Sequence, residues 1–377
     1  RQRVEILKAM VRGARILILD EPTAVLTPQE SDALFRTLRE MVAQGLSIIF
    51  ISHKLAEVQK VCDRVAVLRA GKLVAEAPTR EVTQSQLALW MVGRAIEAPA
   101  RTPATRVGQA LCVLDRVSAA SGRARLHEMS LELRSGEIVS IAGVSGNGQQ
   151  ALAGLLCGVL APTAGSLRFL GQAMPGSVAA LVAHGVARIP EDRHGVGVVG
   201  DLPLWENAVS ERMRATHFSR PALGLRWVRR KAALEHAARI VADFDVRGGG
   251  LHVPARALSG GNMQKLILGR ALRAPDGQVP RLIVAHQPTW GLDVGAVAYV
   301  QQQLIAARDA GAAVLVISDD LDEVLMLGDR VAVMHAGRLT TARPGSQWSR
   351  ETLGLAMAGS APPVVPAAAV EPQPAPA

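Results

Sequence analysis

Cysteine and aromatic side chains are scarce in this chain of 377 residues. The three cysteines, Cys62, Cys112 and Cys157, are odd in number, widely spaced and without a CxxC pair, which argues against a disulfide framework or a zinc site and favours a reducing cytosol. Aromatic residues make up 3% of the chain, too few to form stacking platforms for nucleic acid. The net charge of +9 is scattered, with one small cluster at 226–231, so it does not favour nucleic-acid binding.

Long hydrophobic runs are also absent, although 49% of the residues are hydrophobic. None of the runs reaches the roughly 18 apolar residues that a membrane-spanning helix needs. The sequence therefore predicts a soluble or peripheral protein, and any role in transport would require a separate membrane subunit.

Two stretches of the chain, 15–73 and 281–339, repeat one pattern at a constant offset. In the first, an apolar run ends in Asp-Glu-Pro-Thr at 20–23; in the second, a similar run ends in His-Gln-Pro-Thr at 286–289. Each apolar run predicts a buried parallel strand, and ligands bind at the C-terminal ends of such strands in open α/β sheets. Because only the first copy keeps its carboxylates, we expect one working site and one silent site.

Strand and helix patterns alternate along both copies, which predicts a parallel sheet with right-handed crossovers. In the first part we expect helices over 1–12, 28–43, 54–61 and 79–92, and strands over 15–20, 46–51 and 64–68. A Pro- and Ala-containing linker should cover 94–108. Antiparallel strands are expected around 111–115 and 131–133, a strand over 138–142, a mostly helical insert over about 203–257, and a disordered tail over 360–377.

The acids at the end of the first predicted strand carry the sharpest chemical signal. Asp20 could hold Mg²⁺ through water, and Glu21 could orient or deprotonate an attacking water. His53, expected at the end of the neighbouring strand, could reach a γ-phosphate. The structural alternative is an acid pair that only begins a helix, and the position of His53 favours the functional interpretation.

A glycine-rich loop, 143–148, follows the strand predicted over 138–142 and precedes an apolar helix. Backbone N–H groups in this context cradle phosphates, so Gly143, Gly146 and Gly148 are candidate nucleotide-binding residues. Gln149 and Gln150 stand where such a loop has Lys and then Ser or Thr, which removes an ammonium and a magnesium ligand. A glycine turn retained for packing is the open alternative.

A Leu-Ser-Gly-Gly segment with a following glutamine opens another predicted helix, and its candidate binding residues are Ser259, Gly260, Gly261 and Gln264. This segment, the Asp-Glu-Pro-Thr sequence at 20–23, the Ser52-His53 pair and the repeated pattern together resemble the ATP-binding subunits of ABC transporters. The double-length subunits of bacterial importers for simple sugars and nucleosides are the most similar branch. The resemblance covers about 1–345 and implies P-loop NTPase domains of the ABC type, in tandem, each with a parallel core sheet, a helical insert and a small antiparallel β subdomain.

The resemblance also implies that two units sandwich two nucleotides, ATP with Mg²⁺. The first site would combine residues of the first unit with residues of the second: Asp20, Glu21 and His53 with Ser259, Gly260, Gly261 and Asp293. The second site would combine residues that all depart from the family pattern: Gln149, Gln150, His286, Gln287 and Asp319, with Thr27 in place of an aspartate. Glu191 replaces a glutamine of that family, which could alter magnesium binding at the second site or coupling to the permease. For Trp290, surface packing is the default interpretation.

Gln2 aligns with Gln264, so the resemblance predicts an N-terminally truncated chain, with on the order of 130 further residues before Arg1. The expected domains are 1–93 as the C-terminal part of a first nucleotide-binding domain, a linker over 94–108, a second degenerate domain over 109–345, and a C-terminal segment over 346–377.

The resulting hypothesis is an ATP-hydrolysing subunit on the cytoplasmic face of the bacterial inner membrane. It would act with integral membrane permease subunits and, indirectly, with a periplasmic or lipoprotein substrate-binding protein, and it would not bind nucleic acid. The segment 287–296, Gln-Pro-Thr-Trp-Gly-Leu-Asp-Val-Gly-Ala, resembles the nucleoside branch of these importers more than the ribose branch, which implies a nucleoside as cargo. A non-enzymatic nucleotide-binding scaffold and a soluble double ABC ATPase of translation or DNA repair remain alternatives.

Overall fold

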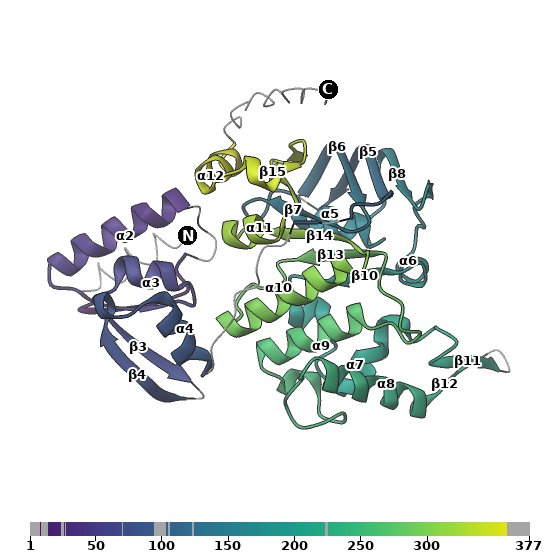
Figure 1. The fold of residues 1–377 in the computed structure, drawn as a ribbon, viewed down its shortest axis with the longest axis horizontal. Helices are drawn as coiled ribbons and strands as arrows, with labels where there is room; N and C mark the ends of the chain where they lie inside the picture. Colours follow the sequence, from purple (N-terminus) through teal and green to yellow (C-terminus); the bar gives the residue numbers. More distant parts are fainter. Residues whose placement is uncertain are drawn as a thin grey trace, which may run out of the picture.

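The computed structural model describes residues 8, 14–23, 26, 28–69, 71–93, 103–104, 106–122, 124–222 and 225–359. Most of the helix expected over 1–12, most of the linker and the tail over 360–377 lie outside these residues, as does Thr27. Figure 1 shows a smaller N-terminal unit in purple and blue beside a larger unit coloured from teal to yellow.

The first unit follows the predicted alternation of strands and helices. Its elements are β1 (Ile16–Asp20), α2 (Pro28–Ala43), β2 (Ser47–Ile51), α3 (Leu55–Val61), β3 (Arg64–Arg69), β4 (Lys72–Pro78), a 3₁₀ turn (Thr79–Glu81) and α4 (Gln84–Val92). β1 and β2 pair in parallel, whereas β3 and β4 form a separate antiparallel pair. The helix predicted over 79–92 is broken, because the extended Val82 ends the turn and Thr83 caps α4 in a capping box with Gln86.

The second unit is built on a central sheet with strand order β10-β13-β14-β7-β15-β16, in which β10, β13, β14, β7 and β15 run parallel. Every residue of β7, β13 and β14 is buried, as expected for strands covered on both faces. The strands of this sheet are β7 (Glu137–Ala142), β10 (Val186–Ile189), β13 (Leu282–His286), β14 (Ala313–Ser318), β15 (Arg330–His335), β16 (Arg338–Leu339) and β17 (Arg343–Pro344).

Two layers cover the central sheet. One apolar cluster packs it against α5 (Gln149–Leu156), α6 (Val178–Ala183) and a second, antiparallel sheet of β5 (Ala110–Ser121), β6 (Ala124–Arg134), β8 (Ala164–Phe169) and β9 (Gln172–Ala173). The other packs it against α7 (Leu204–Val209), α8 (Arg230–Asp243), α9 (Gly260–Leu272) and α10 (Val294–Asp309). α11 (Leu321–Leu327) and α12 (Arg350–Met357) pack beside β15 in a third cluster. The insert predicted as helical also contains a hairpin, β11 (Ser219–Ala222) and β12 (Leu225–Val228).

The first unit has no described strand at the position that β7 holds in the second unit. In the second unit β7 lies between β14 and β15. The corresponding strands of the first unit are β2 and β3, and no described strand lies between them. A cavity of about 950 Å³, lined by residues of both strands including Ile51 and Leu68, occupies that position.

The two units touch where α4 meets the start of α10 (Figure 1). A Cβ built on Gly295 would lie 3.0 Å from Val92 Cγ1, so the helices approach closely. None of the helices in the described ranges is long and apolar enough to cross a membrane.

Candidate functional site

The end of β1 presents the predicted acids of the first unit. Glu21 adopts φ 45°, and its N–H donates to the Ile51 carbonyl at 3.0 Å, which anchors it beside β2. Its Oε1 lies 2.8 Å from His53 Nδ1 and accepts from the His53 backbone N–H at 3.2 Å. Its Oε2 is buried, and none of the residues that the structure describes forms a hydrogen bond with it. A carboxylate held through one oxygen and bare at the other is positioned to accept a proton from water.

Asp20 precedes Glu21 at the same strand end, and its side chain is exposed. Carboxylate oxygens suit Mg²⁺, so the exposed carboxylate of Asp20 fits a magnesium ion at this end of the sheet. The described residues contain no cluster of three or more His, Cys, Asp or Glu side chains placed for a metal, so most of the ion's ligands would have to come from phosphate and water.

The sequence did not predict a threonine–glutamate pair that lies close to this site. Thr23 Oγ1 donates to Glu57 Oε2 at 2.5 Å, and burial raises the pKa of Glu57, while Thr23 and Lys54 lower it. The repeat places Thr289 and Glu323 at the equivalent positions, where burial raises the pKa of Glu323 to about 7. The recurrence at the same offset was the signal that could have revealed the pair.

The glycine loop of the second unit has the backbone conformation expected of a phosphate loop, but Gln149 stands where such a loop has Lys. Gly146 and Gly148 adopt φ 94° and 113°, and α5 starts at Gln149. A Cβ on Gly143 would lie 2.8 Å from the Met334 carbonyl oxygen, so only glycine fits there. Gln149 is buried, with its amide bonded within the loop. The loop therefore has the shape of a phosphate cradle without the ammonium.

The strand ends of the second unit have the same backbone geometry as those of the first, but His286 and Gln287 replace the two acids. Gln287 adopts φ 49° and donates its N–H to the Ile317 carbonyl at 2.8 Å, as Glu21 does to Ile51. Burial lowers the pKa of His286 to about 4, so the imidazole is neutral near pH 7 and its 3.6 Å contact with Glu191 is not a full ion pair. A buried neutral imidazole in place of Asp20 does not fit a magnesium ion.

The Leu-Ser-Gly-Gly segment opens α9, with Ser259 at the N-cap. The Ser259 hydroxyl accepts from Asn262 Nδ2 at 3.0 Å and makes no bond to the helix backbone. A Cβ built on Gly261 would lie 3.9 Å from Asp293, whose Oδ1 caps α10 by accepting from two backbone N–H groups at 3.0 Å. Gln264 is buried and donates to the Pro288 carbonyl at 2.7 Å. Ser259, Gly261 and Asp293 thus lie around the starts of α9 and α10, whereas Gln264 is buried.

Each half of the predicted first site is assembled within its own unit. Glu21 and His53 are in contact in the first unit, and Gly261 lies beside Asp293 in the second. Between the described residues of these two groups, no hydrogen bond or ion pair joins Asp20, Glu21 or His53 to Ser259 or Asp293. The composite site therefore stays a prediction.

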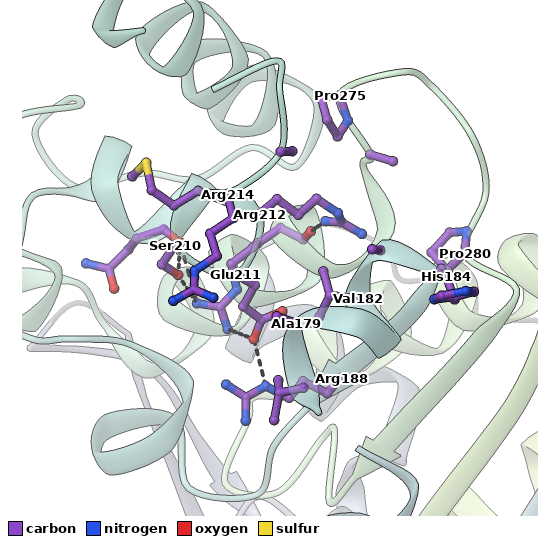
Figure 2. Close-up of a pocket in the computed structure, with 18 of the residues that line it drawn as sticks. Ala179, Val182, His184, Arg188, Ser210, Glu211, Arg212, Arg214, Pro275 and Pro280 are labelled. Atoms are coloured by element: carbon purple, nitrogen blue, oxygen red, sulfur yellow. Dashed lines mark hydrogen bonds and ion pairs between the residues drawn. The ribbon is translucent and has the colours of Figure 1, made fainter. Parts of the chain in front are cut away.

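A cavity of about 1000 Å³ opens at the edge of the central sheet, between α6, the segment 210–215 and the loop 274–281. Figure 2 labels three of the arginines that line it, Arg188, Arg212 and Arg214. Glu211 at its base pairs with Arg188 at 2.8 Å and with the buried Arg270 at 3.2 Å. Arg214 and Arg281 lie exposed on its lining. The cavity therefore carries an excess of positive charge.

Comparison with known proteins gives consistent results. A family model described as ABC transporter matches residues 126–276. The chain is 42% identical over 366 residues to the glucose import ATP-binding protein TsgD13 of Haloferax volcanii, which covers 95% of this chain and 64% of that protein. It is 39% identical over 363 residues to the guanosine import ATP-binding protein NupO of Bacillus subtilis, covering 95% and 69%. The chain thus spans 64% to 69% of the length of these two relatives.

Among solved structures, an ATP-binding cassette of an ABC transporter, MJ1267, matches with a TM-score of 0.54 and 20% identity, over 67% of this chain and 98% of that one. A nucleotide-free cassette matches with a TM-score of 0.52 and 22% identity, over 63% and 93%. These likenesses concern the fold alone, and they confirm the predicted P-loop fold of ABC ATPases.

Proposed function

The chain belongs to the ATP-binding proteins of ABC transporters for sugar and nucleoside import, and from this premise we propose that its first unit supplies the catalytic half of an ATP-hydrolysing site. Hydrolysis at that site energises import of a simple sugar or a nucleoside through a separate membrane permease, with this protein peripheral at the cytoplasmic face. The observation that carries the proposal is the Glu21–His53 contact at the end of β1, with Glu21 Oε2 left free to accept a proton.

Each residue of the proposed site has a distinct task. Glu21 orients the attacking water and takes its proton, and His53 holds the Glu21 carboxylate in place. Asp20 would hold Mg²⁺, which supplies charge neutralisation on the phosphates when bound. Ser259, Gly260, Gly261 and Asp293 would close over the nucleotide from the second unit, with the N-terminus of α9 directed at the phosphates.

The first site also needs a glycine loop of its own. The cavity between β2 and β3 lies where the second unit holds β7, the strand that leads into its glycine loop. We propose that a strand and loop equivalent to β7 and 143–148 fill this cavity in the full-length protein. The second unit's loop does not substitute, because it lacks the Lys and hydroxyl that clamp phosphate and magnesium.

The 377-residue chain by itself is therefore expected to hydrolyse ATP far below ~1 s⁻¹, the low end of ordinary enzyme turnover. The full-length protein in complex with its permease should hydrolyse ATP at an ordinary rate. The measurement is steady-state phosphate release by both proteins at saturating Mg·ATP. Turnover near 1 s⁻¹ by the 377-residue chain, free of contaminating ATPase, would contradict the proposed site.

We further propose that the arginine-lined cavity receives an acidic segment of the permease. Its excess positive charge, with Arg214 and Arg281 exposed, favours a negatively charged partner. Arg214→Glu together with Arg281→Glu should reduce co-purification of the permease about tenfold or more, because each reversal places like charges together. Arg168→Glu, an exposed arginine on β8, is the matched control and should leave co-purification unchanged. An equal loss of permease co-purification in the double variant and in Arg168→Glu would exclude the cavity as the docking surface.

A further inference from the structure

Arg193 is a buried arginine for which the described part of the chain provides no partner. It begins the short helical turn Arg193–Gly197 that follows β10. The residue is only 8% exposed, and no described residue forms a hydrogen bond or an ion pair with its guanidinium. Burial lowers the pKa of Arg193, but an arginine still carries its charge near pH 7. Because burying a lone charge is costly, this guanidinium points to a ligand that the chain binds there.

The acids close to Arg193 are held by other groups. Asp192, next to it in the chain, caps the turn, because its Oδ1 accepts from two backbone N–H groups at 3.1 and 2.8 Å. Glu191 lies 3.6 Å from His286. Asp293 uses its Oδ1 to cap α10. None of these three described acids forms an ion pair with Arg193, so its charge is left for another anion.

The guanidinium lies between the start of α9 and the segment that leads into α10. A Cβ built on Gly260, the first residue of α9, would lie 3.2 Å from Arg193 Nη1. A Cβ built on Gly291, three residues before the start of α10, would lie 3.8 Å from Arg193 Nη2. Arg193 therefore stands behind the two segments that the proposed function places over the nucleotide of the first site.

The start of α9 is an unfavourable place for a cation unless an anion joins it. The N-terminus of this 13-residue helix carries a partial positive charge, and its first N–H groups have no acceptor within the helix. Ser259, the N-cap residue, makes no side-chain bond to that backbone. The helix terminus and the guanidinium of Arg193 thus repel each other, and both attract an anion that binds between them.

We propose that Arg193 of the second unit binds the terminal phosphate of the nucleotide that the first unit holds, together with the N-terminus of α9. This inference rests on the proposed function, because the first unit must present the nucleotide. A terminal phosphate offers the charge and the several oxygens that a guanidinium engages through more than one N–H group. ADP has no phosphate at that position. Arg193 thereby distinguishes ATP from ADP, and its phosphate contact draws the second unit towards the first.

The binding test separates the terminal phosphate from the rest of the nucleotide. It uses the full-length protein with its permease and with Glu21→Gln, so that bound ATP is not consumed, and it measures equilibrium binding of radiolabelled ATP and ADP. Arg193→Met in this background should weaken ATP binding about tenfold or more, because charge-assisted bonds to phosphate are lost. The affinity for ADP should change less than about twofold, because ADP lacks the phosphate that Arg193 contacts.

Arg256→Met is the matched control, because Arg256 lies three residues before Ser259 and pairs with Asp201 on the surface. It should leave both affinities unchanged. An unchanged affinity of Arg193→Met for ATP, or equal losses for ATP and ADP, would overturn the proposal. Binding is measured without hydrolysis, so this result and the turnover test of Glu21 can fail independently.

Thermal unfolding of the 377-residue chain without nucleotide tests whether the guanidinium is unpaired. Arg193→Met replaces a buried charge by an apolar side chain that adapts to the space, so the midpoint should rise by about 2 °C or more. Arg256→Met should leave the midpoint unchanged, because an exposed ion pair contributes little. An unchanged or lower midpoint in Arg193→Met would show that the guanidinium serves the fold, and would overturn the proposal.

Discussion

Glu21→Gln in the full-length protein, assembled with its permease, is expected to reduce ATP turnover about 10²–10⁴-fold. The amide keeps the size of the side chain and can still reach His53, but it cannot take a proton from water. Glu21 Oε2, which forms no hydrogen bond with any described residue, is the atom whose basicity is lost. Steady-state phosphate release at saturating Mg·ATP measures the effect, and nucleotide binding should persist.

Gln287→Glu is the matched control for this substitution. Gln287 has nearly the same backbone conformation, φ 49° against 45°, and the same N–H bond to the neighbouring strand. Restoring an acid there should change turnover less than about twofold, because the second site still has Gln149, a neutral His286 and Asp319 instead of the family's groups. Retention of more than half of the native turnover in Glu21→Gln, or a doubling in Gln287→Glu, would falsify the one-site hypothesis.

The periodic parts of the fold could be predicted from the sequence, because apolar runs and caps act locally. β1, α2, β2 and α3 lie within one or two residues of their predicted bounds. β4 was missed, since Lys72 to Pro78 mixes polar and apolar residues and pairs only with β3. The hairpin of β11 and β12 was missed for the same reason, because its arginines and exposed Trp227 give no strand alternation.

Part of the candidate site could be predicted from the sequence, and part could not. Positions at the ends of adjacent parallel strands must lie close together, so the proximity of Glu21 and His53 followed from the pattern, although their catalytic roles stay predictions. The network of Arg188, Glu211 and Arg270 did not, because it depends on how separate elements pack. Sequence spacing carries no information about such long-range approaches.

The second unit should be required for chemistry performed with the first unit's acids. Ser259→Ala in the full-length protein is expected to lower turnover about 10²-fold or more, a loss like that from removing one preorganised donor to developing charge. The Ser259 hydroxyl makes no bond to the α9 backbone, so its removal should not destabilise the helix. Ser177→Ala is the matched control: Ser177 caps α6, and its loss should cost about 1 kcal/mol of stability without lowering turnover.

Asp293→Asn tests the same surface without removing a helix cap. Asp293 caps α10 through Oδ1, and asparagine is an equally good cap, so the fold and thermal stability should be retained. The loss of the carboxylate charge beside Gly261 should still reduce turnover, while Asp320→Asn, which retains the cap of α11, should not. Residues more than 230 positions from Glu21 would then share its phenotype, as a site assembled from both units requires. Native turnover in both Ser259→Ala and Asp293→Asn would place the whole reaction in the first unit and exclude the composite site.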